Sequence, residues 1–169
     1  MTTLEASGLT KTYRVRDGRR ARVLTAVRDV SFTLTPGRTT ALVGQSGSGK
    51  STLARLLLQL ERPTSGRLLL DGTPAARGGG GLRAYRRTVQ MVFQDPFASL
   101  NPYHTVAHHL ERPIRLHHRS LTDAQVRERL THLLDRVQLP AELAGRRPHQ
   151  LSGGQRQRVA IARALAPAP

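Results

Sequence analysis

The segment from Gly44 to Ser51, Gly-Gln-Ser-Gly-Ser-Gly-Lys-Ser, has the residue types and spacing of a P-loop, G-x-x-x-x-G-K-[ST]. Its glycines let successive backbone N–H groups face an anion, and a following helix would direct its positive end at the same phosphates. In this pattern the ammonium of Lys50 contacts the β- and γ-phosphates of a nucleotide, and the Ser51 hydroxyl ligates Mg²⁺. A glycine turn that binds no ligand is the alternative.

The segments on both sides of this loop favour the P-loop interpretation. Residues 39–43, Thr-Thr-Ala-Leu-Val, form a short apolar run of the kind found in buried parallel strands. Residues 52–60 carry leucines at helical spacing, namely Leu53, Leu56, Leu57 and Leu60. The sequence therefore predicts a strand, a glycine loop and a helix in succession.

A second glycine motif, Leu-Ser-Gly-Gly-Gln, occupies residues 151–155. Ser152 is a favourable N-cap, and the two glycines permit close approach of the backbone to an anion. The helix expected after it has an apolar stripe of Val159, Ala162 and Leu165, with Arg156, Arg158 and Arg163 at other positions. Taken alone, the motif is also compatible with an ordinary capped helix.

With these two motifs together, the sequence resembles the ATP-binding subunits of ABC transporters over residues 4–166. Residues 9–13, Leu-Thr-Lys-Thr-Tyr, resemble the segment whose aromatic residue stacks on adenine, with Tyr13 at that position; a core tyrosine is the alternative. Residues 93–96, Phe-Gln-Asp-Pro, resemble the Q-loop, whose glutamine reaches Mg²⁺ and the attacking water; a solvated loop glutamine is the alternative for Gln94.

The resemblance implies a complete set of site residues for ATP and Mg²⁺. Lys50 and Gln94 are the expected catalytic residues, and Ser51 and Gln94 are the expected Mg²⁺ ligands. Nucleotide contacts are implied for Tyr13, Gly44, Gln45, Ser46, Gly47, Ser48, Gly49, Lys50, Ser51, Thr52 and Gln94, and in trans for Ser152, Gly153, Gly154 and Gln155 of a second subunit in a head-to-tail dimer.

A finer resemblance, to the oligopeptide, dipeptide and nickel importers, is carried by residues 90–102, with support from residues 147–150 and 156–165. It implies import of a peptide or nickel-like solute, with membrane permease subunits docking on the Gln94–Pro102 region. We expect Phe97 and Leu100 to expose apolar groups there; the alternative is that they pack into the helical subdomain. The resemblance places the protein in the cytoplasm, peripheral on the inner face of the cell membrane.

In the family, a strand ending in an Asp-Glu pair follows the second motif, and a later loop supplies a histidine for the γ-phosphate. The sequence stops at residues 166–169, Ala-Pro-Ala-Pro, and contains neither. We therefore expect a domain that is incomplete at its C-terminus and that binds ATP without hydrolysing it. A non-hydrolytic nucleotide-binding or dimer-blocking fragment is the alternative. A soluble ABC ATPase acting on nucleic acid is disfavoured because too few residues separate the motifs for a coiled-coil arm.

Composition excludes other classes. The net charge of +16 is compatible with nucleic-acid binding, but the basic residues are scattered, and with three Phe, three Tyr and no Trp the chain has few side chains for base stacking. We therefore expect no nucleic-acid partner. The sequence has no cysteine for disulfides or a thiolate zinc site. It also has no apolar run of 18 residues, so direct membrane insertion is not expected.

The predicted fold class is α/β, an ABC-type P-loop NTPase domain with a mixed sheet core and a helical subdomain. Residues 1–95 would form the strand-rich P-loop core, 96–150 the helical subdomain, and 151–166 the second motif and its helix. Within these parts we expect strands in 4–38, a turn at 36–37, a turn at 63–66 leading into a strand over 67–70, a flexible glycine loop at 78–81, a strand over 88–93, and a helix over 123–137.

Two further patterns lie in the helical part. Thr122 and Gln125 form a predicted capping box at the start of the 123–137 helix. His104 and His108 are spaced i, i+4 on an expected helix near other histidines, a spacing that can bind zinc. A solvated helix face rich in histidine is the favoured interpretation.

Overall fold

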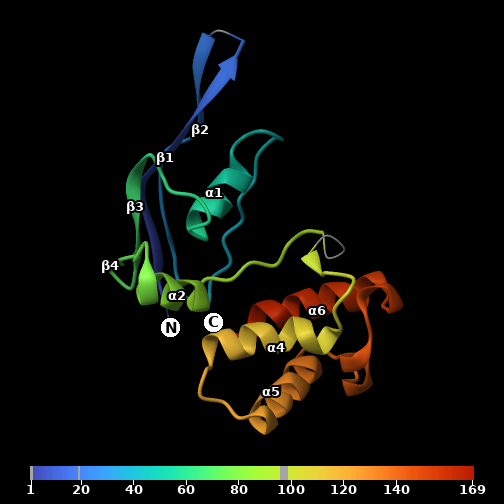
Figure 1. Ribbon diagram of the computed structural model, residues 1–169. Coiled ribbons are helices and arrows are strands. Elements are labelled where there is room, and N and C mark those ends of the chain that lie inside the picture. Colours follow the sequence, from blue (N-terminus) through green and yellow to red (C-terminus); the bar gives the residue numbers. More distant parts are fainter. Residues whose placement is uncertain (1, 19, 96–98) are drawn as a thin grey trace. The chain divides into compact units, whose positions relative to one another are not determined.

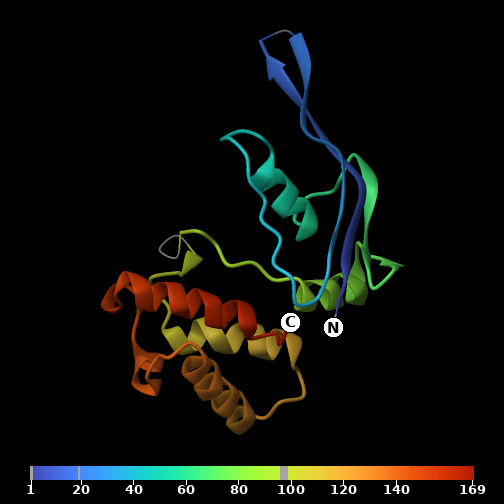
Figure 2. The same cartoon turned by 180° about the vertical axis from the view of Figure 1, so that it is seen from behind.

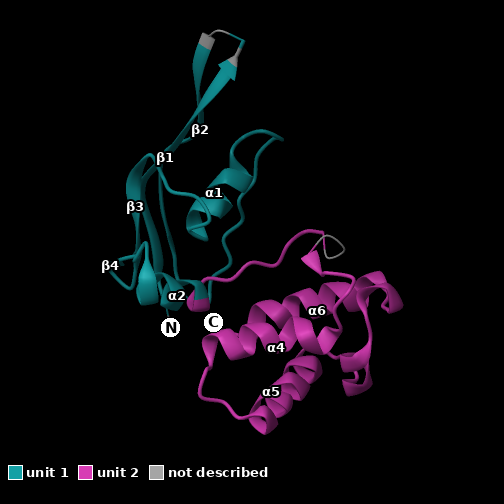
Figure 3. Cartoon of the chain, viewed as in Figure 1, with its two compact units in different colours: residues 1–86 teal, residues 87–169 magenta. Residues whose placement is uncertain are grey.

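The protein is described by a computed structural model that covers residues 2–18, 20–95 and 99–169 (Figure 1). The chain divides into two compact units, residues 1–86 and residues 87–169 (Figure 3). Each unit is built around its own set of buried apolar side chains.

The first unit is based on an antiparallel sheet with the strand order β2-β1-β3-β4. Strands β1 (Leu4–Asp17) and β2 (Arg20–Leu34) form a long hairpin, β3 (Ser65–Leu70) pairs with the other edge of β1, and the short β4 (Thr73–Pro74) pairs with β3. The predicted strands in 4–38, the turn at 36–37 and the strand that follows residues 63–66 are confirmed.

An irregularity in β1 changes which side chains face the interior. Leu4 and Ala6 alternate as buried residues at the start of the strand, whereas Leu9 is the next fully buried one. Between them the pairing register shifts at Gly8, which has φ +60°. Because a one-residue bulge reverses the side-chain alternation, it moves the odd-numbered positions to the buried face.

Helices complete the first unit. Helix α1 (Lys50–Leu57) follows the glycine loop and buries Leu53 and Leu56. Helix α2 (Gly79–Thr88) buries Tyr85, whose hydroxyl donates to the carbonyl of Leu57 at the end of α1. Burial raises the pKa of Tyr85 to about 12, so the phenol remains a donor at any physiological pH.

The second unit is helical. Helix α4 (Val106–His117), α5 (Asp123–Arg136) and α6 (Gly153–Leu165) pack together with two short 3₁₀ turns, η1 (Ala141–Gly145) and η2 (Pro148–Gln150) (Figures 1 and 2). Their shared core contains Leu100, Val106, Leu110, Ile114, Val126, Leu130, Leu133, Leu134, Leu139, Leu151, Val159, Ala162 and Ala166. The predicted helix after Thr122 and its capping box with Gln125 are confirmed.

Two predicted strands are absent from the described chain. Residues 39–43 have no regular structure, and Leu42 and Val43 are 53% and 84% exposed instead of buried. Residues 88–93 likewise form no strand, and Phe93 is 48% exposed. Both predictions were wrong for one reason: a strand forms only when a neighbouring strand accepts its backbone hydrogen bonds, and none of the described strands pairs with either segment.

The glycine run at 78–81 is not a flexible loop either, because helix α2 begins at Gly79. Glycine weakens a helix by roughly 1 kcal/mol per residue, but the following residues bury Tyr85 at 2% exposure and anchor the helix on α1. Tertiary packing therefore outweighs the local preference of the glycines.

Candidate functional site

The backbone of the glycine loop takes the conformations that glycine permits. Gly47 and Gly49 have φ values of +81° and +90°, and Gly49 is the N-cap of α1. Gly49 also lies against β2: a Cβ built on it would be 2.1 Å from the carbonyl oxygen of Ala26. Gly49 therefore sets both the turn into α1 and the contact of α1 with the sheet.

Lys50 is the first residue of α1, and its ammonium turns back into the loop. Its Nζ donates to the carbonyl oxygens of Gly44 at 2.7 Å and Gln45 at 2.6 Å, and to the Ser48 hydroxyl at 3.3 Å. The loop thus holds a cation among backbone groups, where the P-loop pattern predicts one.

The start of α1 lacks the groups that normally stabilise a helix N-terminus. Gly49 provides no side-chain cap, and the first turn contains no acidic residue and begins with Lys50. A cation at the positive end of a helix dipole is unfavourable, so this helix start is less stable than one with a side-chain cap and an acidic first turn. An anion bound at this point would satisfy the N–H groups and offset the lysine charge, which fits the phosphates of a nucleotide. Ser51 is exposed and Thr52 is half-buried in the same turn, so both hydroxyls lie next to that anion position.

Tyr13 lies in β1 and is half-buried, so it is not a fully buried core residue. Its hydroxyl donates to the Glu61 carboxylate, and its phenol also interacts with the side chain of Thr52 in α1. Tyr13 is therefore held beside the P-loop helix. Its stacking on a base stays a prediction. No sequence pattern indicates Glu61 as its partner, because these residues are 48 positions apart.

Gln94 is exposed, belongs to the second unit and is preceded by an irregular segment. Pro96, Phe97 and Ala98 lie outside the described residues. Leu100 is 2% exposed and is part of the core of the second unit, so the expectation that it offers an apolar surface was wrong. It packs there because the 99–103 segment is fixed to the helices, with the Asn101 carbonyl 3.1 Å from Nε2 of His109. Tyr103, at 82% exposure, is the apolar side chain presented instead.

The Ser-Gly-Gly-Gln segment begins helix α6 as a complete capping box. Gln155 N donates to the Ser152 hydroxyl at 3.3 Å, and the Gln155 side-chain oxygen accepts from Ser152 N at 2.9 Å. Val159 and Ala162 are buried as predicted, while Leu165 is half-buried.

The two glycines in this helix start have no packing role. Cβ atoms built on Gly153 or Gly154 would meet nothing within 4 Å, and neither residue has a positive φ. Each costs about 1 kcal/mol of helix propensity relative to alanine. An exposed, glycine-lined helix N-terminus leaves room for an external group to approach the backbone, as the predicted contact in trans with phosphates requires.

The histidines do not form a metal site within the described part of the chain, where no group of three potential ligands converges. His104 precedes α4, so His104 and His108 do not share a helix as expected, but their rings stack with centroids 3.9 Å apart. Both are exposed, which agrees with the favoured solvated interpretation. His109 is buried, and burial lowers its pKa below the usual value.

Comparisons with known proteins identify the family of this chain. The family described as ABC transporter matches residues 27–169. A probable peptide ABC transporter ATP-binding protein of Sinorhizobium fredii is 48% identical over 170 residues, which cover 98% of this chain and 48% of the relative. A glutathione import ATP-binding protein of Salmonella typhimurium is 45% identical over 167 residues, 96% of this chain and 27% of the relative. A nickel import ATP-binding protein of Brucella suis is 44% identical over 172 residues, 100% of this chain and 64% of the relative. The chain thus spans about half the length of the first of these relatives.

The fold is also that of solved ATP-binding cassettes. A dimeric post-hydrolysis cassette bound to ADP and Pi has a TM-score of 0.82 at 33% identity, over 98% of this chain and 70% of that chain. The cassette cbiO1 of Clostridium perfringens, described as part of the ABC transporter complex cbiONQ, has a TM-score of 0.78 at 30% identity, over 98% of this chain and 62% of that chain. No helix within the described ranges has the length and apolar character needed to cross a bilayer. The chain belongs to the ABC transporter family and has the fold of its ATP-binding cassette.

Proposed function

We propose that this chain is the ATP-binding part of an importer for a peptide or nickel-like solute. The observation that carries the proposal is the helix α1 N-terminus, which combines glycine turns, no side-chain cap and an inward-turned Lys50. The relatives named for peptide, glutathione and nickel import support the solute class.

Two copies, or this chain and a similar subunit, would face head to tail. The Gly44–Ser51 loop of one subunit and Ser152 to Gln155 of the other would enclose MgATP between them. Ser51 and Gln94 would hold Mg²⁺, which screens the phosphate charge, and Lys50 would hold the β- and γ-phosphates. The unpacked glycines of α6 support the contact in trans, and a solved relative is described as a dimer bound to ADP and Pi.

The test of nucleotide binding compares Lys50→Ala with Arg83→Ala, which also removes one positive charge from the same unit, at an exposed position of α2. Lys50→Ala should weaken MgATP binding, because the phosphates lose their fixed cation, whereas Arg83→Ala should bind like the wild type. Fluorescence titration with a labelled ATP measures both. Equal affinities for wild type and Lys50→Ala would refute the proposed phosphate site.

A polypeptide of these 169 residues should bind MgATP without turning it over. Its residues position the phosphates and Mg²⁺, but we assign no carboxylate in it to polarise the attacking water. Purified wild type should release phosphate no faster than Lys50→Ala. Release by the wild type that disappears in Lys50→Ala would show that another group in the chain activates water.

We propose that permease subunits dock on the Gln94–Pro102 region at the cytoplasmic face of the membrane. The neighbouring Phe93 and Tyr103 are 48% and 82% exposed, which supports an apolar contact at this edge. Because the chain has no cysteine, a single cysteine at Tyr103 can be crosslinked to the permease in membranes, with exposed Glu128 in α5 as the control position. Crosslinking at both positions alike, or at neither, would argue against this docking site.

A further inference from the structure

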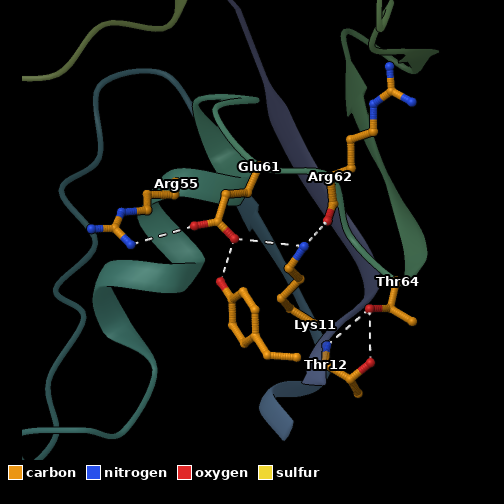
Figure 4. Close-up of polar contacts among 7 residues, drawn as sticks. Lys11, Thr12, Arg55, Glu61, Arg62 and Thr64 are labelled. Atoms are coloured by element: carbon orange, nitrogen blue, oxygen red, sulfur yellow. Dashed lines mark hydrogen bonds and ion pairs between the residues drawn. The ribbon is translucent and has the colours of Figure 1, made fainter. Parts of the chain in front are cut away.

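A polar cluster in the first unit joins β1 to the end of α1 (Figure 4). Its centre is the Glu61 carboxylate, which accepts from the hydroxyl of Tyr13. One carboxylate oxygen lies 3.7 Å from Nζ of Lys11, and the other lies 3.5 Å from a guanidinium nitrogen of Arg55. Glu61 thus connects a strand residue, a helix residue and a tyrosine that the strand presents.

The backbone around Glu61 is held as well. Lys11 Nζ donates to the carbonyl oxygen of Arg62 at 2.7 Å, and Thr64 N donates to the Thr10 carbonyl at 2.8 Å. The Thr12 amide donates to the Thr64 hydroxyl at 3.0 Å. The turn is therefore fixed to β1 just after Glu61, and the Glu61 amide itself donates to the Arg55 carbonyl of α1 at 3.3 Å, so the carboxylate has a defined position relative to the strand.

The charge states of the pair keep the bond in place. The hydrogen bond from Tyr13 lowers the pKa of Glu61, with help from Lys11 and Arg55, so the carboxylate is ionised at neutral pH. The same hydrogen bond and partial burial raise the pKa of Tyr13, so the phenol keeps its proton. A neutral donor and a charged acceptor form one of the stronger kinds of hydrogen bond.

This bond limits what the tyrosine ring can do. A tyrosine held at its hydroxyl and at its Cβ cannot swing away from α1, and Lys11 Nζ lies 5.1 Å from the ring centroid over one face. A planar group can therefore stack only on the opposite face. A stacking platform that is already ordered loses less entropy when a base binds.

We propose that Glu61 is a positioning residue that holds the Tyr13 ring in place for stacking on the nucleotide base. The inference rests on the proposed nucleotide-binding function. The inference adds to that function a residue that does not contact the phosphates and that should affect only the binding of ligands with a base.

The competing explanation is that Glu61 merely ties the turn to the sheet. The two roles differ in their dependence on the ligand. A structural tie would affect base-free and base-containing ligands alike, because both need an intact P-loop. A positioning residue for Tyr13 would affect ATP and spare magnesium tripolyphosphate, which has the three phosphates and no base.

The experiment measures the affinities of MgATP and magnesium tripolyphosphate by calorimetry for a set of variants. Tyr13→Ala removes the stacking platform and should weaken MgATP by about 5- to 100-fold, from the usual energy of base–aromatic stacking. Glu61→Ala should weaken MgATP by roughly three- to tenfold, and Glu61→Gln, which keeps an acceptor oxygen, should restore part of the loss. Tripolyphosphate affinity should stay within about twofold in all three variants.

Two controls define the outcomes. Arg62→Ala should bind both ligands normally, because its side chain points away from the cluster and only its backbone carbonyl takes part (Figure 4). Lys50→Ala should weaken both ligands. Unchanged binding in Lys50→Ala would overturn the proposed function itself.

The inference is overturned separately if Glu61→Ala weakens both ligands equally or weakens neither. If Glu61→Ala does not fold, Tyr13→Phe answers the question, because it removes only the hydroxyl that Glu61 holds. It should weaken MgATP as Glu61→Ala is expected to, and normal MgATP binding by Tyr13→Phe would refute the positioning role.

Discussion

The glycines of the P-loop can be separated into those needed for backbone conformation and those needed for packing. Gly47 and Gly49 both have positive φ, so alanine at either position adopts a left-handed conformation at a cost of about 1–2 kcal/mol. At Gly47 a Cβ would meet nothing within 4 Å. At Gly49 it would lie 2.1 Å from the Ala26 carbonyl oxygen, whereas real Cβ atoms essentially never come within 3.0 Å of another heavy atom.

Gly49→Ala must therefore push α1 and β2 apart by about 1 Å, and overpacking of this kind adds about 1–3 kcal/mol. We expect Gly47→Ala to lower the free energy of unfolding by about 1–2 kcal/mol and Gly49→Ala by about 2–5 kcal/mol. Gly66→Ala provides a second crowded site away from the loop, because its Cβ would lie 2.3 Å from the Gly8 carbonyl oxygen.

Urea unfolding without nucleotide measures these losses, since all three variants retain the same charge. Hydrogen exchange adds a local measurement: amides of β2 near Ala26 should exchange faster in Gly49→Ala and not in Gly47→Ala. Equal losses at Gly47 and Gly49, with β2 protected in both, would show that α1 does not depend on this contact, and the packing argument would be wrong.

Two further predictions concern the second unit. Ser152→Ala and Thr122→Ala each remove a capping box, so each should lower the free energy of unfolding in urea by about 1 kcal/mol. Only Ser152→Ala should also reduce ATP-dependent dimer formation. Equal effects of the two variants on the dimer would contradict the contact in trans. Burial lowers the pKa of His109 in the folded state, so below the usual value of 6.5 the unfolded chain binds more protons than the folded chain, and the free energy of unfolding should fall as the pH drops. The variant His109→Gln keeps a donor for the Asn101 carbonyl and should flatten this pH dependence. An unchanged slope in that variant would exclude His109 as its source.

The features predicted correctly from sequence are those whose physics is local. The P-loop turn depends on glycines that are close together in the chain, and the predicted Thr122–Gln125 capping box and Ser152 N-cap depend on residues at the start of their own helices. The strands within residues 4–38 and the buried Leu53 and Leu56 of α1 also follow from short-range periodicity. The prediction was wrong for Leu60, which is 56% exposed because α1 ends at Leu57. The incorrect predictions concern burial that depends on distant partners. The apolar run at 39–43 has no described strand beside it, and Leu100 is buried by helices that follow it in the chain.

The residues of the candidate site could likewise be predicted only where they belong to a local sequence pattern. A phosphate site could be predicted at Lys50 and Ser51 because the motif contains the glycines and the helix start that would position these residues. The partner of Tyr13 could not be found, because no pattern in the sequence relates a strand residue to a glutamate 48 positions later. That contact exists only after α1 has packed against β1 and β2.

Helix α1 is held at both of its ends, and this explains how the proposed phosphate site and the proposed base site can act on one ligand. At its start, Gly49 touches the Ala26 carbonyl of β2; beyond its end, Glu61 binds Lys11 and Tyr13 of β1. A helix of 8 residues is about 12 Å long. One anchor lies just before its first residue and the other beyond its last, so the two together restrain it from sliding or turning on the sheet. The cation at Lys50 and the ring of Tyr13 therefore keep a fixed spacing before any ligand arrives. A ligand with a base and phosphates can make both contacts, and little entropy is lost in aligning the two protein groups when it binds. Loosening either anchor should thus weaken binding of the whole nucleotide more than binding of base-free phosphates.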